Sequence, residues 1–216
     1  MKRIVVTGAS SGIGAAIVAR LVSLGHEVIG VSRRQPAAGT WLSADLSRVE
    51  EISRISNELR SVPINALIHN AGIWESDAFS NDYEFETSSP EEIRTILNVN
   101  LLAPILLTQG LIDPLAAEQG RVILIGSTSG LDNIGLPEVA YNASKAGLRG
   151  AAQAMSVALV RRRIAVTLIN PGDVDTEPGG RPPRLSLADL VESVVHCLAL
   201  SPQTVISEMT LRPRPM

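Results

Sequence analysis

The chain is poor in cysteine and in aromatic residues, and each scarcity narrows what the protein can be. Cys197 is the only cysteine among 216 residues, so an internal disulfide framework cannot form. This usage fits a reducing compartment. Aromatic residues make up only 3% of the chain, with two each of Trp, Tyr and Phe, so the core must be built mainly from aliphatic side chains.

An excess of basic residues and long apolar runs are also missing. The net charge is −3, whereas proteins that bind nucleic acid usually show a basic excess. No apolar run reaches the ~18 residues of a membrane span. Ile4-Val5-Val6, after the charged start, is too short for a signal peptide. We therefore expect a soluble cytoplasmic protein that binds neither nucleic acid nor membrane.

The sequence lacks the residue spacing of a metal site and that of a serine esterase. His26, His69 and His196 lie far apart and lack the ligand spacing of a metal site, so we expect no metal. The pair His196-Cys197 lies in an apolar helical stretch and is interpreted as packing. Ser10 and Ser11 are not part of a Gly-x-Ser-x-Gly elbow, so an esterase has no support.

What the sequence does contain is a regular alternation of short apolar runs and helical stretches. Strands are predicted at Arg3–Thr7, Glu27–Ser32, Thr40–Leu42, Asn65–His69, Arg121–Ile125, Ile164–Asn170 and Val205–Leu211. Helices are predicted at Ile13–Leu24, Val49–Leu59, Glu91–Ile112, Val139–Arg161 and Leu187–Leu200. This order predicts an α/β fold, a Rossmann-type doubly wound parallel sheet of about seven strands with helices on both faces. Without a linker or repeat, residues 1–216 are expected to form a single domain.

Local signals mark the starts of three helices, and two other segments look irregular. The capping signals are Ser47-x-x-Glu50, Ser89 followed by Pro90, and Ser186-x-x-Asp189. Ile73–Ser89 carries five carboxylates and is expected to be an exposed loop. Asp173–Arg184 is rich in proline and glycine and is expected to be irregular as well.

A glycine-rich turn follows the first predicted strand and opens the first helix. Glycines let the backbone approach a pyrophosphate closely, and the helix N-terminus supplies amide donors. The candidate contacts are Gly8, Ser10, Ser11, Gly12, Ile13 and Gly14. A plain glycine-rich turn is the alternative interpretation.

Tyr141 and Lys145 are spaced to share one helix face, and Ser127 lies fourteen residues before Tyr141. A phenol normally titrates near ~10, and a neighbouring ammonium lowers its pKa by favouring the phenolate. A serine hydroxyl nearby can hold a substrate oxygen. The group predicts a proton donor and acceptor suited to hydride transfer at a carbonyl carbon. An ordinary helix face is the alternative.

The end of the second predicted strand bears on the choice of cofactor. A carboxylate there binds the ribose 2′-hydroxyl of NAD, whereas an arginine accommodates the 2′-phosphate of NADP. Here the strand ends in Ser32-Arg33-Arg34 without a carboxylate. These three residues predict a preference for NADP(H) over NAD(H). The alternative is that both arginines are solvated surface charges.

Taken together, five motifs in order resemble the short-chain dehydrogenases/reductases, non-extended NADP-dependent type. The motifs are Thr7–Gly14, Asn70-Ala71-Gly72, Asn98-Val99-Asn100-Leu101, Ser127 with Tyr141-x-x-x-Lys145, and Pro171-Gly172 followed by Thr176. The resemblance runs from Arg3 to about Thr176. The interval from Ser127 to Tyr141 is one residue longer than the commonest spacing in the family, and we place the extra residue in the loop Leu131–Glu138.

The resemblance implies a role for each catalytic candidate. Tyr141 would be the general acid in reduction and the base in oxidation. Lys145 would lower its pKa and bond the nicotinamide ribose, while Ser127 would orient the substrate oxygen. Asn100 would kink its helix and hold a water that links Lys145 to solvent.

The resemblance also implies further cofactor contacts and an assembly. Asp45 and Leu46 would meet the adenine, Asn70, Ala71 and Gly72 the adenosine ribose, and Pro171, Gly172, Val174 and Thr176 the nicotinamide carboxamide. The helices Glu91–Ile112 and Val139–Arg161 would pair between subunits of a homodimer or homotetramer. Ala143, Ala146, Gly147, Gly150, Ala151 and Ala154 would permit their close approach, although packing against the chain's own sheet would also explain these small residues.

The function that the resemblance implies is an NADP(H)-dependent reductase or dehydrogenase acting on a small carbonyl or alcohol. Family members usually cover the substrate with a helical lid, and here only a shortened lid at about 173–185 is available. The short lid keeps open a second function, a non-catalytic NADP(H)-binding regulatory protein on the same fold.

Overall fold

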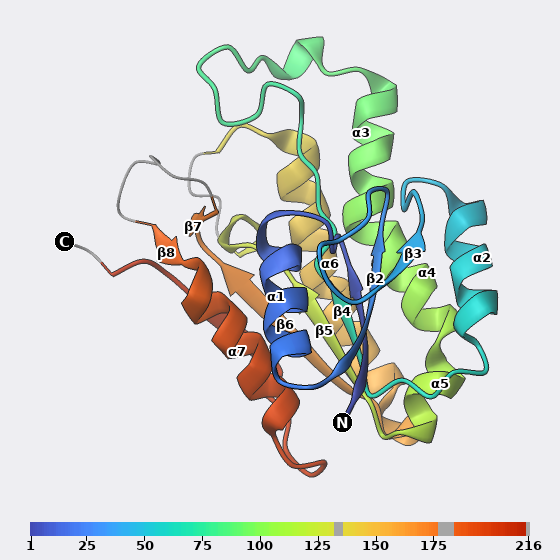
Figure 1. The fold of residues 1–216 in the computed structure, drawn as a ribbon. Helices are drawn as coiled ribbons and strands as arrows, with labels where there is room; N and C mark the ends of the chain where they lie inside the picture. Colours follow the sequence, from blue (N-terminus) through green and yellow to red (C-terminus); the bar gives the residue numbers. More distant parts are fainter. Residues whose placement is uncertain (132–135, 177–183, 215–216) are drawn as a thin grey trace.

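A parallel sheet of seven strands forms the centre of the computed structural model, which describes residues 1–131, 136–176 and 184–214 (Figure 1). The strands are β1 (Arg3–Thr7), β2 (Glu27–Ser32), β3 (Thr40–Ser43), β4 (Ala66–His69), β5 (Arg121–Ile125), β6 (Ala165–Pro171) and β9 (Glu208–Leu211). Their order across the sheet is β3-β2-β1-β4-β5-β6-β9, and every neighbouring pair is parallel.

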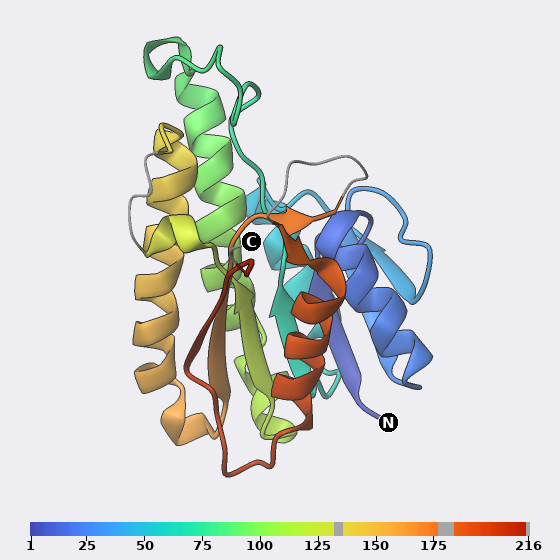
Figure 2. The ribbon, with the colours of Figure 1, turned by 90° about the vertical axis from the view of Figure 1, so that its left-hand side faces the viewer.

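Helices cover both faces of the sheet. On one face lie α1 (Gly12–Ser23) and α7 (Leu187–Ala199), as Figures 1 and 2 show. On the other lie α2 (Val49–Leu59), α4 (Ala103–Gly110) and α6 (Val139–Ala158), with α3 (Pro90–Leu97) and α5 (Ile112–Ala117) at the two ends of α4. The predicted doubly wound Rossmann-type sheet is therefore confirmed.

Alternating residues of each central strand enter opposite core layers. In β1, Ile4 and Val6 pack in the layer under α1 and α7, whereas Val5 packs in the layer under α2, α4 and α6. All three are fully buried. A parallel strand covered on both sides needs apolar side chains on both sides, which explains the unbroken apolar runs of the sequence.

The helix predicted over Glu91–Ile112 is wrong as one continuous α-helix. It is divided into α3, a π-helical turn η2 (Asn98–Leu102) and α4. Pro104 has no N–H to offer the carbonyl of Asn100 four residues earlier, and its ring crowds that carbonyl, so the regular bonding pattern cannot continue there. The π-helical turn contains Asn100, the residue to which the resemblance assigned a kink.

Two other boundaries differ from the expected ones by more than a single residue. The last strand begins at Glu208 rather than Val205, and α6 ends at Ala158 before a short 3-10 turn, η4 (Val160–Arg162). Arg163 follows that turn in a left-handed conformation, with φ of 56°, which ends the helical stretch.

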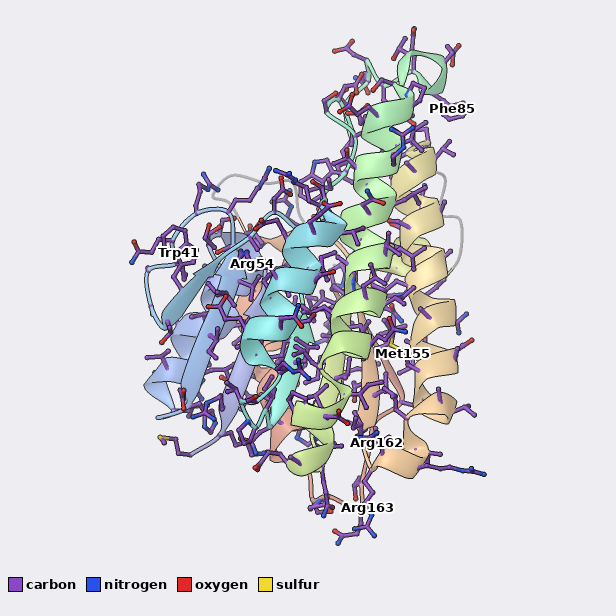
Figure 3. All side chains as sticks on the ribbon, turned by 90° about the vertical axis from the view of Figure 1, so that its right-hand side faces the viewer. Trp41, Arg54, Phe85, Met155, Arg162 and Arg163 are labelled. Carbon is purple, nitrogen blue, oxygen red and sulfur yellow. The ribbon has the colours of Figure 1, made fainter. Side chains whose placement is uncertain are left out.

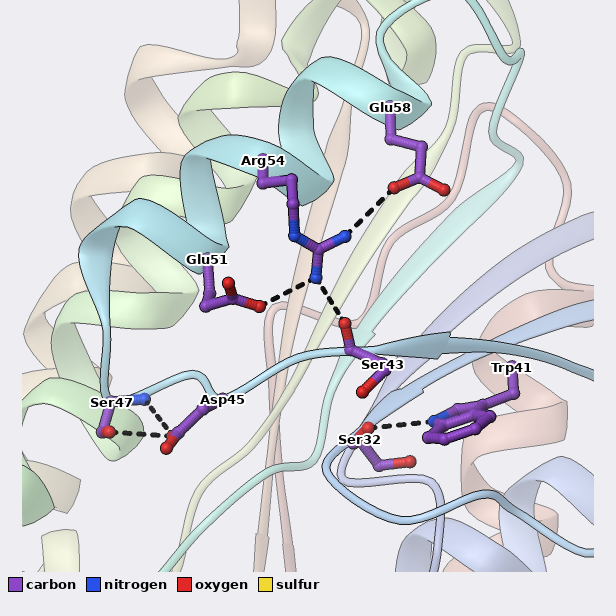
Figure 4. Close-up of polar contacts among 8 residues, drawn as sticks. All are labelled: Ser32, Trp41, Ser43, Asp45, Ser47, Glu51, Arg54 and Glu58. Atoms are coloured by element: carbon purple, nitrogen blue, oxygen red, sulfur yellow. Dashed lines mark hydrogen bonds and ion pairs between the residues drawn. The ribbon is translucent and has the colours of Figure 1, made fainter.

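The capping signals at Ser89 and Ser186 are confirmed, and the one at Ser47 is wrong. Ser89 and Ser186 accept hydrogen bonds from the backbone N–H groups of Glu92 at 3.1 Å and Asp189 at 3.4 Å. Ser47 instead donates its N–H and hydroxyl to Asp45 Oδ1 at 3.0 and 2.8 Å (Figure 4). The carboxylate of Asp45 competes for the hydroxyl, so α2 starts without a side-chain cap.

The two segments expected to be irregular are more ordered than their composition suggested. The stretch between β4 and α3 contains a 3-10 turn, η1 (Phe85–Thr87), and a buried carboxylate, Glu75. In the expected lid, β7 (Val174–Asp175) pairs with β8 (Leu185–Ser186). The rest of that lid, residues 177–183, lies outside the described residues.

Among the described residues, the structure contains no helix that combines the length and the apolar character needed to cross a membrane.

His69, at the end of β4, gives the fold a defined sensitivity to acid. The ring is buried with Nε2 2.8 Å from the hydroxyl of Thr108, and burial lowers its pKa to about 3. In the unfolded chain the ring titrates near ~6.5. Below about pH 6.5 the unfolded state therefore binds a proton at this ring, whereas the ring stays neutral in the folded state. The free energy of unfolding falls as the pH is lowered through this range.

Replacing His69 with asparagine should remove this sensitivity, because an amide can still hydrogen-bond Thr108 but does not ionise. Between pH 7 and pH 4.5, roughly two units below the unfolded pKa, the wild type should lose about 2 to 3 kcal/mol more unfolding free energy than the variant. Urea unfolding of both proteins at both pH values measures the difference. Equal losses would show that His69 is not the acid-sensitive group.

Candidate active site

The carboxyl ends of the central strands converge on one edge of the sheet. The strand order reverses between β1 and β4, since β1 is followed in sequence by β2 on one side and β4 pairs with it on the other. Open α/β sheets bind ligands at such a point, just beyond the strand ends. The glycine-rich turn follows β1, Asn70 follows β4, and Ser127 follows β5, so the structure brings the predicted motifs to this edge.

The glycine-rich turn cannot carry larger residues at two positions. Gly8 has φ of +68°, and a Cβ there would lie 2.8 Å from the Cα of Ala71. A Cβ on Gly14 would lie 2.1 Å from the carbonyl oxygen of Gly8. Gly12, also at positive φ, faces open space, and Ser11 leaves the N-terminus of α1 without a side-chain cap. Ser10 and Ile13 are half-buried beside it.

Asn70 ties the turn after β4 to the turn after β1. Its Nδ2 donates to the carbonyl oxygens of Thr7 and Gly8 at 3.2 and 3.3 Å. The N–H of Ala71 bonds the hydroxyl of Thr7 at 3.1 Å. These contacts give Asn70 and Ala71 a structural role. Gly72 is exposed next to Lys145, and a Cβ built on it would lie 3.5 Å from the Lys145 Nζ, an ordinary van der Waals contact.

At the end of β2, Arg33 and Arg34 are accessible to a ligand, whereas Ser32 is buried. The buried Ser32 donates its hydroxyl to the carbonyl of Arg34 at 2.6 Å, and its own carbonyl accepts the indole N–H of Trp41 at 3.0 Å (Figure 4). The hydroxyl proton of Ser32 is therefore already used inside the turn. Arg33 and Arg34 are exposed.

Asp45 interacts electrostatically with one arginine of this pair, Arg33. Partial burial opposes ionisation, but hydrogen bonds from Ser47 and the charges of Arg33 and Arg48 lower the pKa of the carboxyl below its usual value. Asp45 is therefore a carboxylate at neutral pH within electrostatic reach of Arg33. Leu46, which follows it, is buried.

Ser127, Tyr141 and Lys145 come together between β5 and α6. Ser127 begins a 3-10 turn, η3 (Thr128–Gly130), and is hydrogen-bonded to Tyr141. Lys145 Nζ lies 5.8 Å from the centroid of the Tyr141 ring and donates to the carbonyl of Ile125 at 3.0 Å. Burial lowers the pKa of Lys145 to about 8.

The expectation that Lys145 lowers the pKa of Tyr141 is wrong for this structure. Burial raises the pKa of the phenol above its ordinary value, and the charges of Glu138 and Glu75 act in the same direction. Only the hydrogen bond with Ser127 opposes them. The ammonium is held at the carbonyl of Ile125, so desolvation decides the direction. Tyr141 is therefore protonated at neutral pH.

Asn100 is buried in the π-helical turn and fastens the segment after Gly72. Its Oδ1 accepts the N–H of Ile73 at 2.9 Å, and its Nδ2 donates to the carbonyl of Ile73 at 2.8 Å and to the hydroxyl of Ser144 at 2.9 Å. Asn100 thereby connects this segment to α6, the helix that carries Tyr141 and Lys145.

The end of β6 forms the far side of the site. Pro171 is buried in the strand, and the N–H of Gly172 donates to the carbonyl of Leu211 at 2.8 Å. Val174 lies in the short strand β7, and Thr176 comes directly after that strand. A cavity of about 280 Å³ opens here, lined by Thr128, Gly172, Asp173, Arg212 and Pro213. One of its lining residues, Thr128, directly follows Ser127 in the sequence.

The sequence did not reveal a reciprocal pair of buried carboxylates, Glu75 and Glu138, at the start of α6. Glu75 Oε1 accepts the backbone N–H groups of Ala140 at 2.9 Å and Tyr141 at 3.3 Å. In return, Glu138 Oε1 accepts the N–H of Phe79 at 2.7 Å. Glu75 belongs to a run of carboxylates typical of a solvated loop, and nothing in that run distinguishes the residue that meets a helix terminus.

Glu75 should therefore influence both the stability of α6 and the acidity of Tyr141. In Glu75→Ala the cap is lost, at a cost of about 1 kcal/mol of unfolding free energy, whereas Glu75→Gln keeps an acceptor and should be closer to wild type. Both variants remove a charge that raises the pKa of Tyr141. The alkaline limb of the rate of carbonyl reduction should move to lower pH in both.

Urea unfolding and a pH–rate profile measure the two effects of Glu75 separately. A pH profile that shifts in Glu75→Ala but not in Glu75→Gln would assign the effect to helix position rather than charge.

No group of three or more His, Cys, Asp or Glu residues within residues 1–131, 136–176 and 184–214 is arranged to hold a metal ion.

The comparison with known families decides the family of the chain. The model of the short chain dehydrogenase family matches residues 2–181. The chain belongs to the short-chain dehydrogenases. They are oxidoreductases. The resemblance to this family that the five sequence motifs indicated is confirmed, and the NADP-dependent type stays a prediction.

Individual short-chain dehydrogenases resemble this chain over most of its length. It is 34% identical over 196 residues to 3-dehydrosphinganine reductase TSC10B of Arabidopsis thaliana. That match covers 82% of this chain but only 56% of the plant protein, so this chain spans little more than half the length of that relative. A metagenomic short-chain oxidoreductase solved with NADP is 29% identical, has a TM-score of 0.82, and is matched over 98% of its length and 99% of this chain.

An oxidoreductase from Brucella ovis solved with a partially ordered NAD is also 29% identical, with a TM-score of 0.83 and 99% of both chains covered. The two solved relatives thus differ in the cofactor with which each was crystallised.

Proposed function

We propose that this short-chain dehydrogenase is an NADP(H)-dependent oxidoreductase that interconverts a carbonyl compound and an alcohol. The observation that carries the proposal is the grouping of Ser127, Tyr141 and Lys145 beside the glycine-rich turn, at the edge where the strand order reverses. Bound nicotinamide would supply or accept the hydride, and the residues of this chain would handle the proton.

The residues at the strand ends fit a dinucleotide. Gly8 and Gly14 let the turn pack closely against its own backbone and against Asn70 and Ala71, while Gly12 faces open space. The uncapped N-terminus of α1 offers amide donors to a pyrophosphate. The remaining contacts we propose are Asp45 and Leu46 at the adenine, Asn70, Ala71 and Gly72 at the adenosine ribose, and Pro171, Gly172, Val174 and Thr176 at the nicotinamide carboxamide.

Tyr141 donates its hydroxyl proton to the substrate oxygen in reduction and recovers it in oxidation. Its raised pKa keeps it protonated at neutral pH, the form that reduction requires. Ser127 donates a hydrogen bond that holds the substrate oxygen in line. Lys145, with a pKa of about 8, is mostly charged at pH 7 and would bond the nicotinamide ribose. Asn100 holds the water that returns the proton from solvent.

Consumption of NADPH by the purified protein tests this function. A panel of ketones, aldehydes, quinones and sugars should include compounds that are reduced to the matching alcohols. If NADPH binds but none of the panel is turned over, the alternative function, an NADP(H)-binding regulatory protein, gains support. The observation that favours that alternative is the short cover over the site, where only β7 and β8 are described.

We also propose that the protein assembles as a homodimer or homotetramer through α6 and the neighbouring helix formed by α3 and α4. Figure 3 shows α6 on the outer flank beside these helices. Ala143, Ala146, Gly150 and Ala154 on α6 are exposed, so packing against the chain's own sheet does not explain them. Gly147 instead meets Leu101, where a Cβ would come within 2.8 Å of its side chain.

Ala146→Arg should therefore dissociate the assembly, because a long charged side chain prevents two helices from approaching closely. Analytical ultracentrifugation at micromolar concentration should show an oligomer for the wild type and a monomer for the variant. Ala19→Arg, on the exposed side of α1, makes the same change elsewhere and should stay oligomeric. A monomeric wild type would remove the interface.

A further inference from the structure

Most aromatic residues of this chain lie in the segment between β4 and α3 rather than in the core. Of the six, Trp74, Phe79, Tyr83 and Phe85 lie in the segment between β4 and α3, and Tyr141 is the fifth. Trp74 and Phe79 keep 55% and 54% of their surface exposed. A chain that builds its core from aliphatic residues thus places two large rings in solvent beside Tyr141.

Trp74 and Phe79 form an aromatic wall against the ring of Tyr141. The ring centroids of Trp74 and Phe79 lie 5.7 Å apart, and those of Phe79 and Tyr141 lie 5.9 Å apart. Trp74 and Tyr141 are separated by 6.4 Å, and all three pairs meet edge to face. Each ring therefore contacts the other two, in a geometry that aromatic pairs prefer.

The aromatic wall is held in place by bonds from its own segment to the catalytic helix. Glu75, between the two rings in sequence, caps α6, and Tyr83 accepts the N–H of Val139 at 3.3 Å. Phe79 has φ of +64°, a conformation that residues with a side chain rarely adopt, and Glu138 bonds its N–H. Strained backbone persists where its surroundings determine it, so the position of this exposed ring is specified by the structure.

The charge around the aromatic wall limits what can bind there. The segment from Ile73 to Ser89 carries Glu75, Asp77, Asp82, Glu84 and Glu86 and has no Lys or Arg. A carboxylate or phosphate on the substrate would be repelled, whereas an uncharged ring would not. A substrate ring packed on Trp74 and Phe79 would lie beside the ring of Tyr141, which contacts both.

We propose that Trp74 and Phe79 form the specificity-determining surface of the site and select uncharged carbonyl compounds with an aromatic ring beside the C=O group. The choice of ketone rests on the proposed function, because Tyr141 must be the proton donor. Binding of the ring itself does not depend on turnover.

Steady-state reduction of three matched ketones tests the selection. Acetophenone should be preferred to its saturated counterpart, cyclohexyl methyl ketone, and to its charged counterpart, 4-acetylbenzoate. Trp74→Leu should raise the KM for acetophenone by about tenfold, the effect of losing aromatic contacts worth roughly 1.4 kcal/mol. The KM for cyclohexyl methyl ketone and the kcat for both should change by less than about twofold.

Two further variants serve as a repeat and a control. Phe79→Leu should reproduce the effect, which guards against misfolding of Trp74→Leu alone. Phe85→Leu changes an equally exposed ring of the same segment outside the aromatic wall and should leave every KM unchanged. If acetophenone is reduced with the same KM by wild type, Trp74→Leu and Phe79→Leu, the proposal is wrong while the proposed function stands.

A binding measurement separates failure of this proposal from failure of the proposed function. Trp41 lies at the β3 edge, away from the end that carries Phe85 (Figure 3), so Trp41→Phe leaves Trp74 as the only tryptophan. The Trp74 emission should change when 1-phenylethanol is added and not when 1-cyclohexylethanol is added, even if no ketone is turned over. An emission that responds to neither alcohol, or only to protein concentration because a second copy covers the rings, would overturn the proposal.

Discussion

Tyr141→Phe is expected to lower the rate of carbonyl reduction by about a hundredfold to ten-thousandfold, the usual loss when a general acid is removed. The phenol is the group hydrogen-bonded to Ser127, and its raised pKa keeps the proton available at neutral pH. Phenylalanine retains the ring and its contacts with Trp74 and Phe79, so the fold and the shape of the site should be preserved.

Two measurements on the Tyr141→Phe protein are needed. Turnover of any ketone found active with the wild type should collapse, and NADPH binding, measured by calorimetry, should stay within about threefold because the ring is not a major cofactor contact. Turnover near the wild-type rate would show that another group donates the proton. Ser127→Ala, which removes the neighbouring hydroxyl, should lower the rate by a smaller factor.

Arg33→Asp is expected to weaken NADPH binding by roughly ten to a few hundred fold. The 2′-phosphate carries up to two negative charges, and a guanidinium at the end of β2 can meet it with charge-assisted hydrogen bonds worth ~1.5–3 kcal/mol each. Asp45 already places a carboxylate within electrostatic reach of Arg33. A second carboxylate at position 33 would therefore repel the phosphate as well as remove its partner.

The same Arg33→Asp variant should improve NADH binding, since the new carboxylate can accept from the ribose 2′-hydroxyl. Titration of both cofactors against wild type and variant measures the change. Arg60→Asp makes the same charge change at an exposed position after α2 and should alter neither affinity by more than about twofold. Equal affinity of the wild type for NADH and NADPH would reduce Arg33 and Arg34 to solvated surface charges.

Much of the fold could be predicted because its signals are local. Apolar runs covered on both sides identify the parallel strands, and the Ser89-Pro90 and Ser186 signals mark helix starts that the structure confirms. The candidate site could be located because each motif directly follows a strand, and parallel strands align those ends at one edge. The continuous helix over Glu91–Ile112 was wrong because the effect of Pro104 on the Asn100 carbonyl was overlooked.

The rest depends on contacts between distant segments, which spacing alone does not encode. The direction of the Tyr141 pKa shift follows from burial and from Glu75 and Glu138, and neither carboxylate could be distinguished from its solvated neighbours. Trp74 and Phe79 stood in a segment interpreted only by its charge. Cofactor preference, assembly and the roles of Ser127 and Lys145 remain predictions for the experiments above.

Glu75 and Glu138 each accept hydrogen bonds from the other's segment, and these bonds limit how the protein can be redesigned. The segment that carries the aromatic wall supplies the cap for the helix that carries Tyr141, and that helix supplies the carboxylate that holds Phe79. A segment transplanted from a relative to change the substrate range would leave α6 uncapped unless it kept Glu75, and a chimaera would need both carboxylates from one parent. The segment that carries the aromatic wall and the start of α6 would therefore have to be exchanged together.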